Sequence, residues 1–323
     1  MKKAANVKHR VFFLVPQEVQ LLDVTGPVHL FYEANEYGAN IATYFLALEN
    51  KKEALSSAGL SLGPLEHFTS FELNENDILI IPGFESRIFF AEDFSIKNEG
   101  FFVWLKRQSQ NSAKICSICT GTYLLAFGGL CDKKNCATHW KYFEDFQERF
   151  PKAKLQTDRL FVKDGNLYSS AGVSSGIDLS LFLLEELLGP VFATKIAKEV
   201  VIYLRRTEND PQLSVFLQYR NHIENRVHQV QDLLAQQLAE KKSIEELAEK
   251  VHMSPRNLTR LFKKTTGITI GSYVEKLRVE KALQLLSQNE KVSSVAKACG
   301  LNSSNQLRSL LKKYQTNPFS TII

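Results

Sequence analysis

A cysteine, an aspartate and a histidine in the first half of the chain carry the side chains that covalent catalysis requires. Cys119 follows an apolar run and precedes Thr120 and Gly121, a pattern typical of a strand that passes directly into a helix. Such a turn places its first side chain over the edge of a sheet, where the helix N-terminus can lower a thiol pKa. Asp23 comes after the first apolar run, and His139 lies in a later loop. One hypothesis is therefore a cysteine nucleophile with an acidic helper and a histidine base.

Each of these residues also has a purely structural explanation. Free cysteines are commonly buried, so Cys119 is equally well explained as a small residue that lines a pocket. His139 alone is better explained as a cap of the helix that begins at Trp140. Cys116 and Cys119 form a CxxC pair, but no second pair follows, and the odd total of five cysteines argues against a disulfide framework. We therefore expect no metal, no other cofactor and a reducing cytoplasm.

The elements that would position these residues alternate between strands and helices. Residues 11–15 form a fully apolar run typical of a buried strand, residues 77–83 are predicted as a second buried strand, and strands are also predicted over residues 41–48, 114–118 and 166–170. Helices are predicted over residues 27–37 (with Pro27 at the start), 101–108, 122–127, 140–150, 177–188 and 191–202. This alternation predicts an α/β fold, a flavodoxin-like three-layer sandwich with a mostly parallel sheet. Ligands of such sheets bind at the carboxyl ends of the strands, where we expect a small-molecule site of Asp23, Gly83, Cys119, Thr120 and His139.

A helix, tight turn and second helix are predicted over residues 243–264. Apolar residues recur at helical spacing in both helices, and Ser254 with Pro255 is a good start for the second one. Such a second helix can enter the major groove of DNA. We expect base contacts from Arg256, Thr259 and Arg260, with Asn257 beside them, and phosphate contacts from Lys263 and Lys264.

The same order of apolar and polar residues recurs over residues 291–313. The offset between the copies is 48 before the turn and 49 after it, so the second turn is one residue longer. We expect Ser304, Asn305 and Arg308 to contact bases, and Lys312 and Lys313 to contact phosphates. An amphipathic helix over residues 273–287 would connect the copies and hold the two reading helices about one DNA turn, roughly 34 Å, apart. Two motifs in register, each with a basic end, make a chance all-α domain a poor explanation.

Length and charge agree with two domains of different character. A chain of 323 residues with 44% hydrophobic residues is sufficient for two globular cores. Residues 223–323 hold sixteen Lys and Arg against nine Asp and Glu, a balance of +7, whereas residues 1–222 have a balance of −2. We predict an α/β domain over residues 1–208, a linker over 209–222 and an all-α DNA-binding domain over 223–323. No apolar run is long enough for a membrane span, and residues 1–10 lack the architecture of a signal peptide.

The last hundred residues resemble the AraC/XylS family of bacterial transcription activators. The residues that carry the resemblance are Ile244, Ala248, Leu258, Leu261, Phe262, Lys263, Gly267, Tyr273, Leu277, Arg278, Ala282, Leu285, Leu286, Ala296, Gly300 and Leu307. His252 stands where the family usually has a turn glycine, and histidine tolerates a positive φ better than most residues do. The resemblance implies double-stranded DNA and RNA polymerase as partners, and a cytoplasmic, nucleoid-associated protein.

Residues 9–205 resemble the ThiJ/PfpI-like branch of the class I glutamine amidotransferase superfamily. The supporting stretches are residues 22–27, 80–83, 117–122, 137–140 and 170–178. In that superfamily an elbow cysteine and an acidic residue after the first strand form the reactive site, which corresponds here to Cys119 and Asp23. Thr120 stands where the protease-like members have a histidine, and Phe84 replaces a second glycine and implies a reshaped oxyanion-type pocket. Together the two parts resemble the GlxA-type regulators of the AraC/XylS family.

Three functions follow from these observations. The first is a sequence-specific transcription regulator, an activator in the resembling family, whose α/β domain binds an amino acid or another nitrogenous metabolite and forms a homodimer. The second is a cysteine-dependent hydratase or amidase, similar to isonitrile hydratases, with Cys119, Asp23 and His139 as catalytic residues. The third is an interaction module whose α/β domain serves only to dimerise. The absence of a histidine beside Cys119 favours sensing over hydrolysis, so we predict that the protein is not an enzyme.

Overall fold

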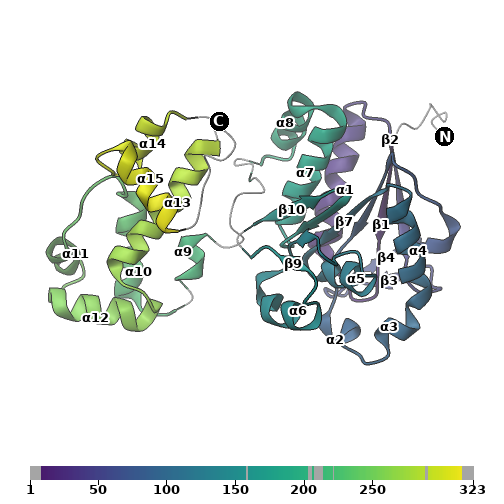
Figure 1. Cartoon of the computed structure of the whole chain (residues 1–323), viewed down its shortest axis with the longest axis horizontal. Helices are drawn as coiled ribbons and strands as arrows, with labels where there is room; N and C mark the ends of the chain where they lie inside the picture. Colours follow the sequence, from purple (N-terminus) through teal and green to yellow (C-terminus); the bar gives the residue numbers. More distant parts are fainter. Residues whose placement is uncertain are drawn as a thin grey trace. The chain divides into compact units, whose positions relative to one another are not determined.

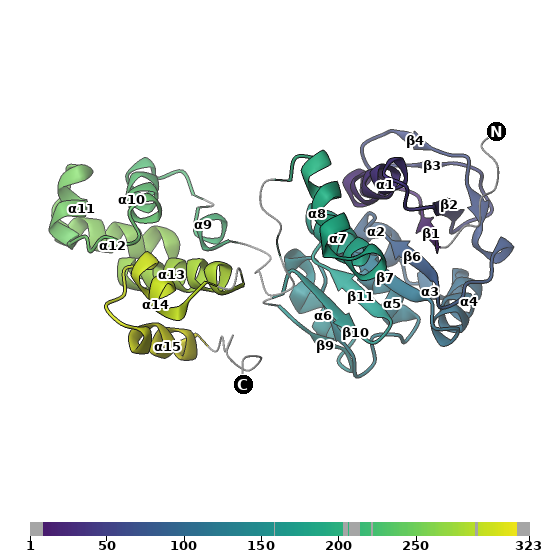
Figure 2. The ribbon, with the colours of Figure 1, turned by 90° about the horizontal axis from the view of Figure 1, so that it is seen from above.

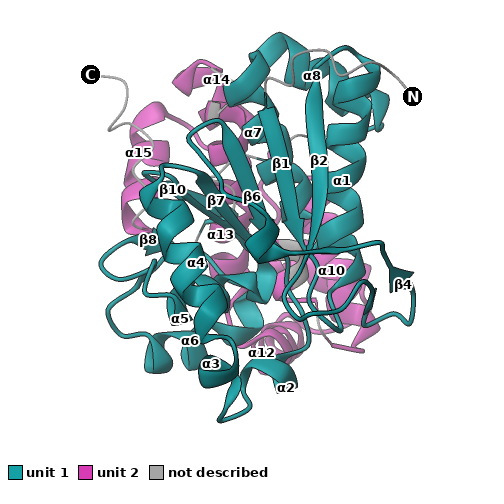
Figure 3. Ribbon diagram, turned by 90° about the vertical axis from the view of Figure 1, so that its right-hand side faces the viewer, with its two compact units in different colours: residues 1–212 teal, residues 213–323 magenta. Residues whose placement is uncertain are grey.

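A computed structural model divides the chain into two compact units, residues 1–212 and 213–323 (Figures 1 and 3). The structure describes residues 9–157, 159–202, 206, 214–220, 222–287 and 290–314. Within the linker expected over residues 209–222, helix α9 (Val215–Gln218) already belongs to the second unit, because Val215 packs against the apolar core of that unit. Residues 209–213 and 221 of this expected linker lie outside the described residues.

The first unit is built on a seven-stranded sheet with the order β10-β11-β7-β6-β1-β2-β5. Its strands are β1 (His9–Leu14), β2 (Ile41–Ala47), β5 (Glu66–His67), β6 (Asp77–Ile81), β7 (Lys114–Ile118), β10 (Phe161–Asp164) and β11 (Leu167–Ser170). Neighbouring strands are parallel except for the β10–β11 pair. Two small separate pairs are β3 (Ala54–Leu55) with β4 (Ser61–Leu62), and β8 (Asn135–Cys136) with β9 (Lys154–Leu155). The predicted mostly parallel sheet is confirmed.

Helices cover both faces of this sheet and make three layers (Figure 2). One face packs against α1 (Leu21–Glu36), α7 (Ser175–Leu188) and α8 (Pro190–Glu199). The other face packs against α4 (Glu99–Gln110) and α5 (Thr122–Phe127), with α2 (Ser86–Phe89), α3 (Phe94–Lys97) and α6 (Phe143–Arg149) beside them. Strand side chains alternate between the faces: Val11 and Phe13 belong to the first core, Phe12 and Leu14 to the second. Strands buried on both faces explain the continuous apolar runs of the sequence.

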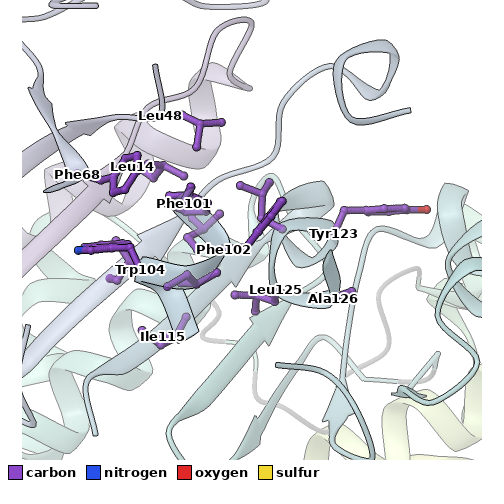
Figure 4. Packing of buried hydrophobic residues seen from close by; sticks show 14 of the residues in the cluster. Leu14, Leu48, Phe68, Phe101, Phe102, Trp104, Ile115, Tyr123, Leu125 and Ala126 are labelled. Atoms are coloured by element: carbon purple, nitrogen blue, oxygen red, sulfur yellow. The ribbon is translucent and has the colours of Figure 1, made fainter. Parts of the chain in front are cut away.

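The core under α4 and α5 is unusually aromatic (Figure 4). Phe101, Phe102 and Trp104 of α4 are at most 9% exposed, and Tyr123 of α5 is fully buried. Their rings contact one another and their neighbours edge-on or tilted, the orientations that aromatic pairs prefer. Each large side chain that is fully buried stabilises the fold by about 1.5–3 kcal/mol. This core fixes α5, and with it the turn that carries Cys119.

Helix α1 begins earlier than the sequence predicted. The prediction placed Pro27 at the first helical position, but the helix starts at Leu21 and Pro27 lies inside it. Proline is most compatible with the first turn, but packing of Leu30, Phe31 and Ala34 against the sheet stabilises the helix as a whole. The correction matters for the site, because Asp23 now lies in the first turn of a helix rather than in a loop.

The second unit consists of helices around two separate small cores. The helices are α9, α10 (Asn225–Gln236), α11 (Ile244–Lys250), α12 (Pro255–Thr266), α13 (Ile270–Ser287), α14 (Val292–Ala298) and α15 (Ser304–Lys313). One core surrounds Leu258 and Phe262 of α12, and the other surrounds Leu307 and Leu311 of α15, with α13 contributing to both. The connecting helix α13 begins three residues before the predicted start at residue 273. Within the described residues, no helix is long and apolar enough to cross a bilayer.

The predicted turn signals of both helix-turn-helix motifs have the expected geometry. Ser254 caps α12 by accepting a hydrogen bond from the N–H of Asn257, and Pro255 follows at the first helical position. His252 has a φ of 52°, as expected of the residue in the place of a turn glycine. Four residues separate α11 from α12 and five separate α14 from α15, so the second turn is one residue longer. Ser303 caps α15 in the same way as Ser254 caps α12.

Candidate functional site

Cys119 lies on a strained turn between β7 and α5. It follows the last residue of β7 and begins a single 3₁₀ turn, Cys119–Gly121, that runs into α5. Its φ of 58° is uncommon for a residue with a side chain and is a form of strain often found at functional sites. The Thr138 hydroxyl donates a hydrogen bond to the Cys119 carbonyl at 3.1 Å, which helps to hold this conformation. The predicted elbow is therefore present, with Cys119 only 6% exposed.

Four of the five residues predicted for the small-molecule site meet around Gly83. A Cβ atom added at Gly83 would lie 2.8 Å from Oδ2 of Asp23, 2.8 Å from Cβ of Cys119 and 2.9 Å from Oγ1 of Thr120. The Gly83 N–H donates to Oδ2 of Asp23 at 3.0 Å. The loop after β6, the first turn of α1 and the elbow after β7 thus converge at the carboxyl edge of the sheet.

A loop that the sequence did not place in the site completes this cluster. The Val173 N–H donates to Oδ1 of Asp23 at 2.8 Å. Gly172 covers the elbow so closely that a Cβ there would lie 2.7 Å from Sγ and 2.3 Å from Cβ of Cys119. Its φ of 104° also requires glycine. A backbone N–H has no sequence signature, so only the glycine after β11 could have indicated this contact.

The electrostatics of the cluster keep the thiol protonated. Burial raises the pKa of the Cys119 thiol well above its ordinary value, and the Asp23 carboxylate raises it further, whereas hydrogen bonds from Thr120 lower it. Burial likewise raises the pKa of Asp23 from 3.8 to about 6, although the N–H groups of Gly83 and Val173 stabilise its charged form. An activated nucleophile needs the opposite shift, a depressed thiol pKa.

The groups near Cys119 that could act as a base or as oxyanion donors already form hydrogen bonds within the protein. Oγ1 of Thr120 accepts from the Phe84 N–H and donates to the Phe84 carbonyl, both at 3.1 Å. The Phe84 ring is buried in the aromatic core. His139 accepts a hydrogen bond from the Lys141 N–H as the cap of the 3₁₀ turn Trp140–Tyr142, the structural role weighed above. Burial lowers the pKa of His139, so its ring is neutral near pH 7. No cluster of three or more metal-binding side chains occurs in the described part of the chain.

The raised pKa of Asp23 predicts a measurable pH dependence of stability. The folded state favours the protonated carboxyl, so the stabilisation that Asp23 contributes should be complete below about pH 4 and be lost as the pH rises through about 6. A shift of this size corresponds to about 3 kcal/mol. Asp23→Asn has no proton to lose, so between these pH values its free energy of unfolding should fall by about 3 kcal/mol less than that of the wild type. Urea unfolding of both proteins across this range measures it, and identical slopes would contradict a raised pKa.

The first recognition helix presents its predicted DNA-contacting side chains to solvent. Leu258 and Phe262 of α12 are fully buried, and the exposed residues of this helix are Pro255, Arg256, Asn257, Thr259, Arg260, Lys263 and Lys264. The Thr259 hydroxyl donates to carbonyls of its own helix, which leaves its methyl group and oxygen lone pairs for contacts. A capped, basic helix with one apolar face has the form needed to enter a major groove.

The second recognition helix is similar, with one difference. Asn305, Arg308 and Lys312 of α15 are exposed, and Ser304 is half-buried. Oδ1 of Asn305 accepts a hydrogen bond from Arg308 at 3.3 Å. Nζ of Lys313, predicted to contact phosphate, forms an ion pair with Glu275 of α13 at 2.5 Å. Lys313 therefore ties α15 to the connecting helix in this structure.

A three-layer α/β unit with a buried cysteine elbow, joined to a unit with two basic helix-turn-helix motifs, defines a DNA-binding transcription regulator. CdhR, an HTH-type transcriptional regulator of Pseudomonas aeruginosa, is 29% identical over 315 residues, 95% of this chain and 89% of the relative. Isonitrile hydratase of Pseudomonas putida is 31% identical over 178 residues, 55% of this chain and 71% of the enzyme. The crystal structure of an AraC family transcriptional regulator from Pseudomonas putida aligns with a TM-score of 0.52 and 21% identity, over 59% of this chain and 99% of its own, and supports the fold alone.

The chain belongs to the DJ-1/PfpI family, whose model matches residues 9–186. Residues 247–321 match the model of a helix-turn-helix domain. The resemblance to regulators that join a ThiJ/PfpI-like domain to an AraC-type DNA-binding domain is thus confirmed.

Proposed function

We propose that the protein is a sequence-specific activator that binds double-stranded DNA through α12 and α15, and that its α/β domain senses a small nitrogenous metabolite without converting it. Residues 1–208 would be the sensor and 223–323 the reading domain, with a homodimer formed through the sensor. RNA polymerase would be its partner at the promoter, and the cytoplasmic nucleoid its location.

The observation that carries the DNA-binding part is the pair of exposed recognition helices. Each has a buried apolar stripe, a serine cap and basic side chains on its outer face. Arginine can bind guanine through two hydrogen bonds, and asparagine can do so for adenine. The roles assigned to Arg256, Thr259, Arg260, Asn305 and Arg308 rest on this chemistry and on their exposure.

The state of Cys119 supports sensing over catalysis. Its thiol pKa is raised, Thr120 is bonded to Phe84, and the amides of Gly83 and Phe84 already donate to side chains. The alternative is a cysteine-dependent hydratase, which the similarity to isonitrile hydratase favours. Product formation by the full chain from isonitrile or amide substrates, lost in both Cys119→Ser and Asp23→Ala, would establish that alternative; we expect no turnover.

Two substitutions on α12 test the reading model. A DNA site is first obtained by in vitro selection with the wild-type chain. We expect Arg260→Ala to weaken binding to that site by about 1–3 kcal/mol and to leave random DNA nearly unaffected, because a base contact is lost. Lys264→Ala should weaken binding to both DNAs alike, because a phosphate contact is lost. The slope of log affinity against log salt concentration should become shallower by about one.

Mobility-shift titrations at several salt concentrations measure these effects. If both variants lowered the affinity for selected and random DNA equally, the division into base and phosphate contacts would be wrong. Lys250→Ala, in the last turn of α11 rather than on a recognition helix, is the matched control for loss of a surface charge.

A further inference from the structure

The cysteine elbow is too closely packed to hold an effector without rearrangement. Gly172 lies against Cys119, and both oxygens of Asp23 are occupied by the amides of Gly83 and Val173. The hydroxyl of Thr120 is likewise used by Phe84. An incoming molecule would have to displace these hydrogen bonds inside a buried cluster, where leaving a polar group without a partner is unfavourable.

An open cavity of about 560 Å³ lies nearby at the same edge of the sheet. It is bounded by the segments that follow β1, β2 and β6, and by residues of α2, α3 and α4. Small-molecule sites of open α/β sheets occur at this edge, and their usual volume is about 300–1,000 Å³. Its apolar wall includes the buried rings of Phe68, Phe84, Phe94 and Phe101. Phe68 and Phe101 lie close together in Figure 4 and are 5.3 Å apart between ring centroids.

Phe84 connects this cavity to the cysteine elbow. Phe84 is one of the lining residues of the cavity and is 1% exposed; its ring contacts Phe89 and Phe94, and its backbone N–H and carbonyl both bond to Oγ1 of Thr120. A ligand that moves the Phe84 ring must therefore act on the residue that follows Cys119. The elbow would then respond to the ligand without touching it.

The charges around the mouth of the cavity favour a cation. The ionisable groups of its lining are the carboxylates of Glu49 and Asp93, the ammonium group of Lys97 and the imidazole of His67. Glu49 pairs with Lys51, which is not part of the lining, and Asp93 pairs with Lys97. Both pairs are exposed, and exposed ion pairs contribute little to stability, so a ligand ammonium group can compete with either lysine. The negative faces of aromatic rings also attract cations rather than anions.

We propose that the effector site is this cavity beside Phe84, rather than Cys119, and that it takes a small organic cation, an amine with a short apolar body. The proposal rests on the proposed sensing function and deepens it. The apolar body would contact the phenylalanine rings, and the ammonium group would bind Glu49 and Asp93 at the mouth.

Three probes with the same carbon chain test the chemical class. Calorimetric titration of the full chain with butylammonium, 1-butanol and butyrate should give the highest affinity for butylammonium and the lowest for butyrate. The double variant Glu49→Gln with Asp93→Asn should lower the butylammonium affinity about threefold to tenfold, because two exposed charge contacts are lost together. Glu92→Gln, an exposed neighbour that does not line the cavity, is the matched control. Equal affinities for the three probes would overturn the choice of a cation.

A bulky side chain in the cavity tests its location. Gly100 lines the cavity near the start of α4, and a Cβ added there meets no atom within 4 Å, so Gly100→Trp can fold and fill the space. We expect it to abolish butylammonium binding, and Gly100→Ala to retain it. Binding that survived in Gly100→Trp but was lost in Cys119→Ser would overturn the proposal in favour of the elbow. Failure of the wild-type protein to bind butylammonium while it still binds DNA would also overturn the proposal. Loss of DNA binding by the wild-type chain would instead refute the proposed regulator function.

Discussion

Gly172→Ala should destabilise the first unit by more than about 3 kcal/mol, because two separate costs add at this position. The new Cβ would lie 2.3 Å from Cβ and 2.7 Å from Cα of Cys119, and neither of these atoms belongs to the end of a flexible side chain. The φ of 104° adds backbone strain for any residue other than glycine. The loop would have to move away from the elbow, and the Val173 N–H that binds Asp23 would move with it.

Gly38→Ala separates the two costs. Gly38 also has a positive φ, 89°, but an added Cβ there meets nothing within 4 Å, so we expect a loss of only about 1 kcal/mol. Both tryptophans of the chain, Trp104 and Trp140, lie in the first unit, so their fluorescence during urea unfolding reports this unit alone. Equal losses for Gly172→Ala and Gly38→Ala would show that the close approach to Cys119 contributes nothing.

The fold was predictable from the sequence because its signals are local. Continuous apolar runs marked β1 and β6, which are buried on both faces of the sheet, whereas β7 and β11 were predicted as strands although their sequences include serines. The two-residue strands β3, β4, β5, β8 and β9 were not predicted, because two residues show no periodicity, and the four-residue antiparallel strand β10 was not predicted either. The predicted start of α1, at Pro27, was also wrong. The local preference of Pro27 for a first turn was weaker than the packing of the helix on the sheet.

The candidate site was predictable where a side chain carries the contact. Asp23 and Cys119 stood out by type and by their place after apolar runs, and the structure brings them together around Gly83. Val173 contacts Asp23 through its backbone amide, and the residue packed against Cys119 is Gly172. Neither contact involves a side chain whose type could have indicated it in the sequence. The direction in which the pKa of the Cys119 thiol is shifted could not be predicted from the sequence either. A helix N-terminus suggested a lowered value, but burial and Asp23 raise it.

Because the second unit has two separate cores, we predict that its two recognition helices can be disrupted independently of each other. Phe262 is fully buried in the core of the first motif, and Leu307 is fully buried in the core of the second. Removing a large buried side chain costs about 3–5 kcal/mol for Phe262→Ala and about 2–5 kcal/mol for Leu307→Ala. Because these residues belong to different cores, each substitution should loosen one recognition helix and leave the other folded.

Footprinting on the selected DNA site distinguishes the two heads. Each subunit of the wild-type protein should protect two adjacent major-groove segments on one DNA face, about one turn or roughly 34 Å apart. Phe262→Ala should lose protection in one segment and Leu307→Ala in the other, and both variants should bind more weakly. Thr259→Ala, on the exposed face of α12, is the control that changes a contact without opening a core. A wild-type footprint confined to one segment, unchanged by Leu307→Ala, would make the second motif structural, and α15 would then serve to brace α13 through the Lys313–Glu275 ion pair.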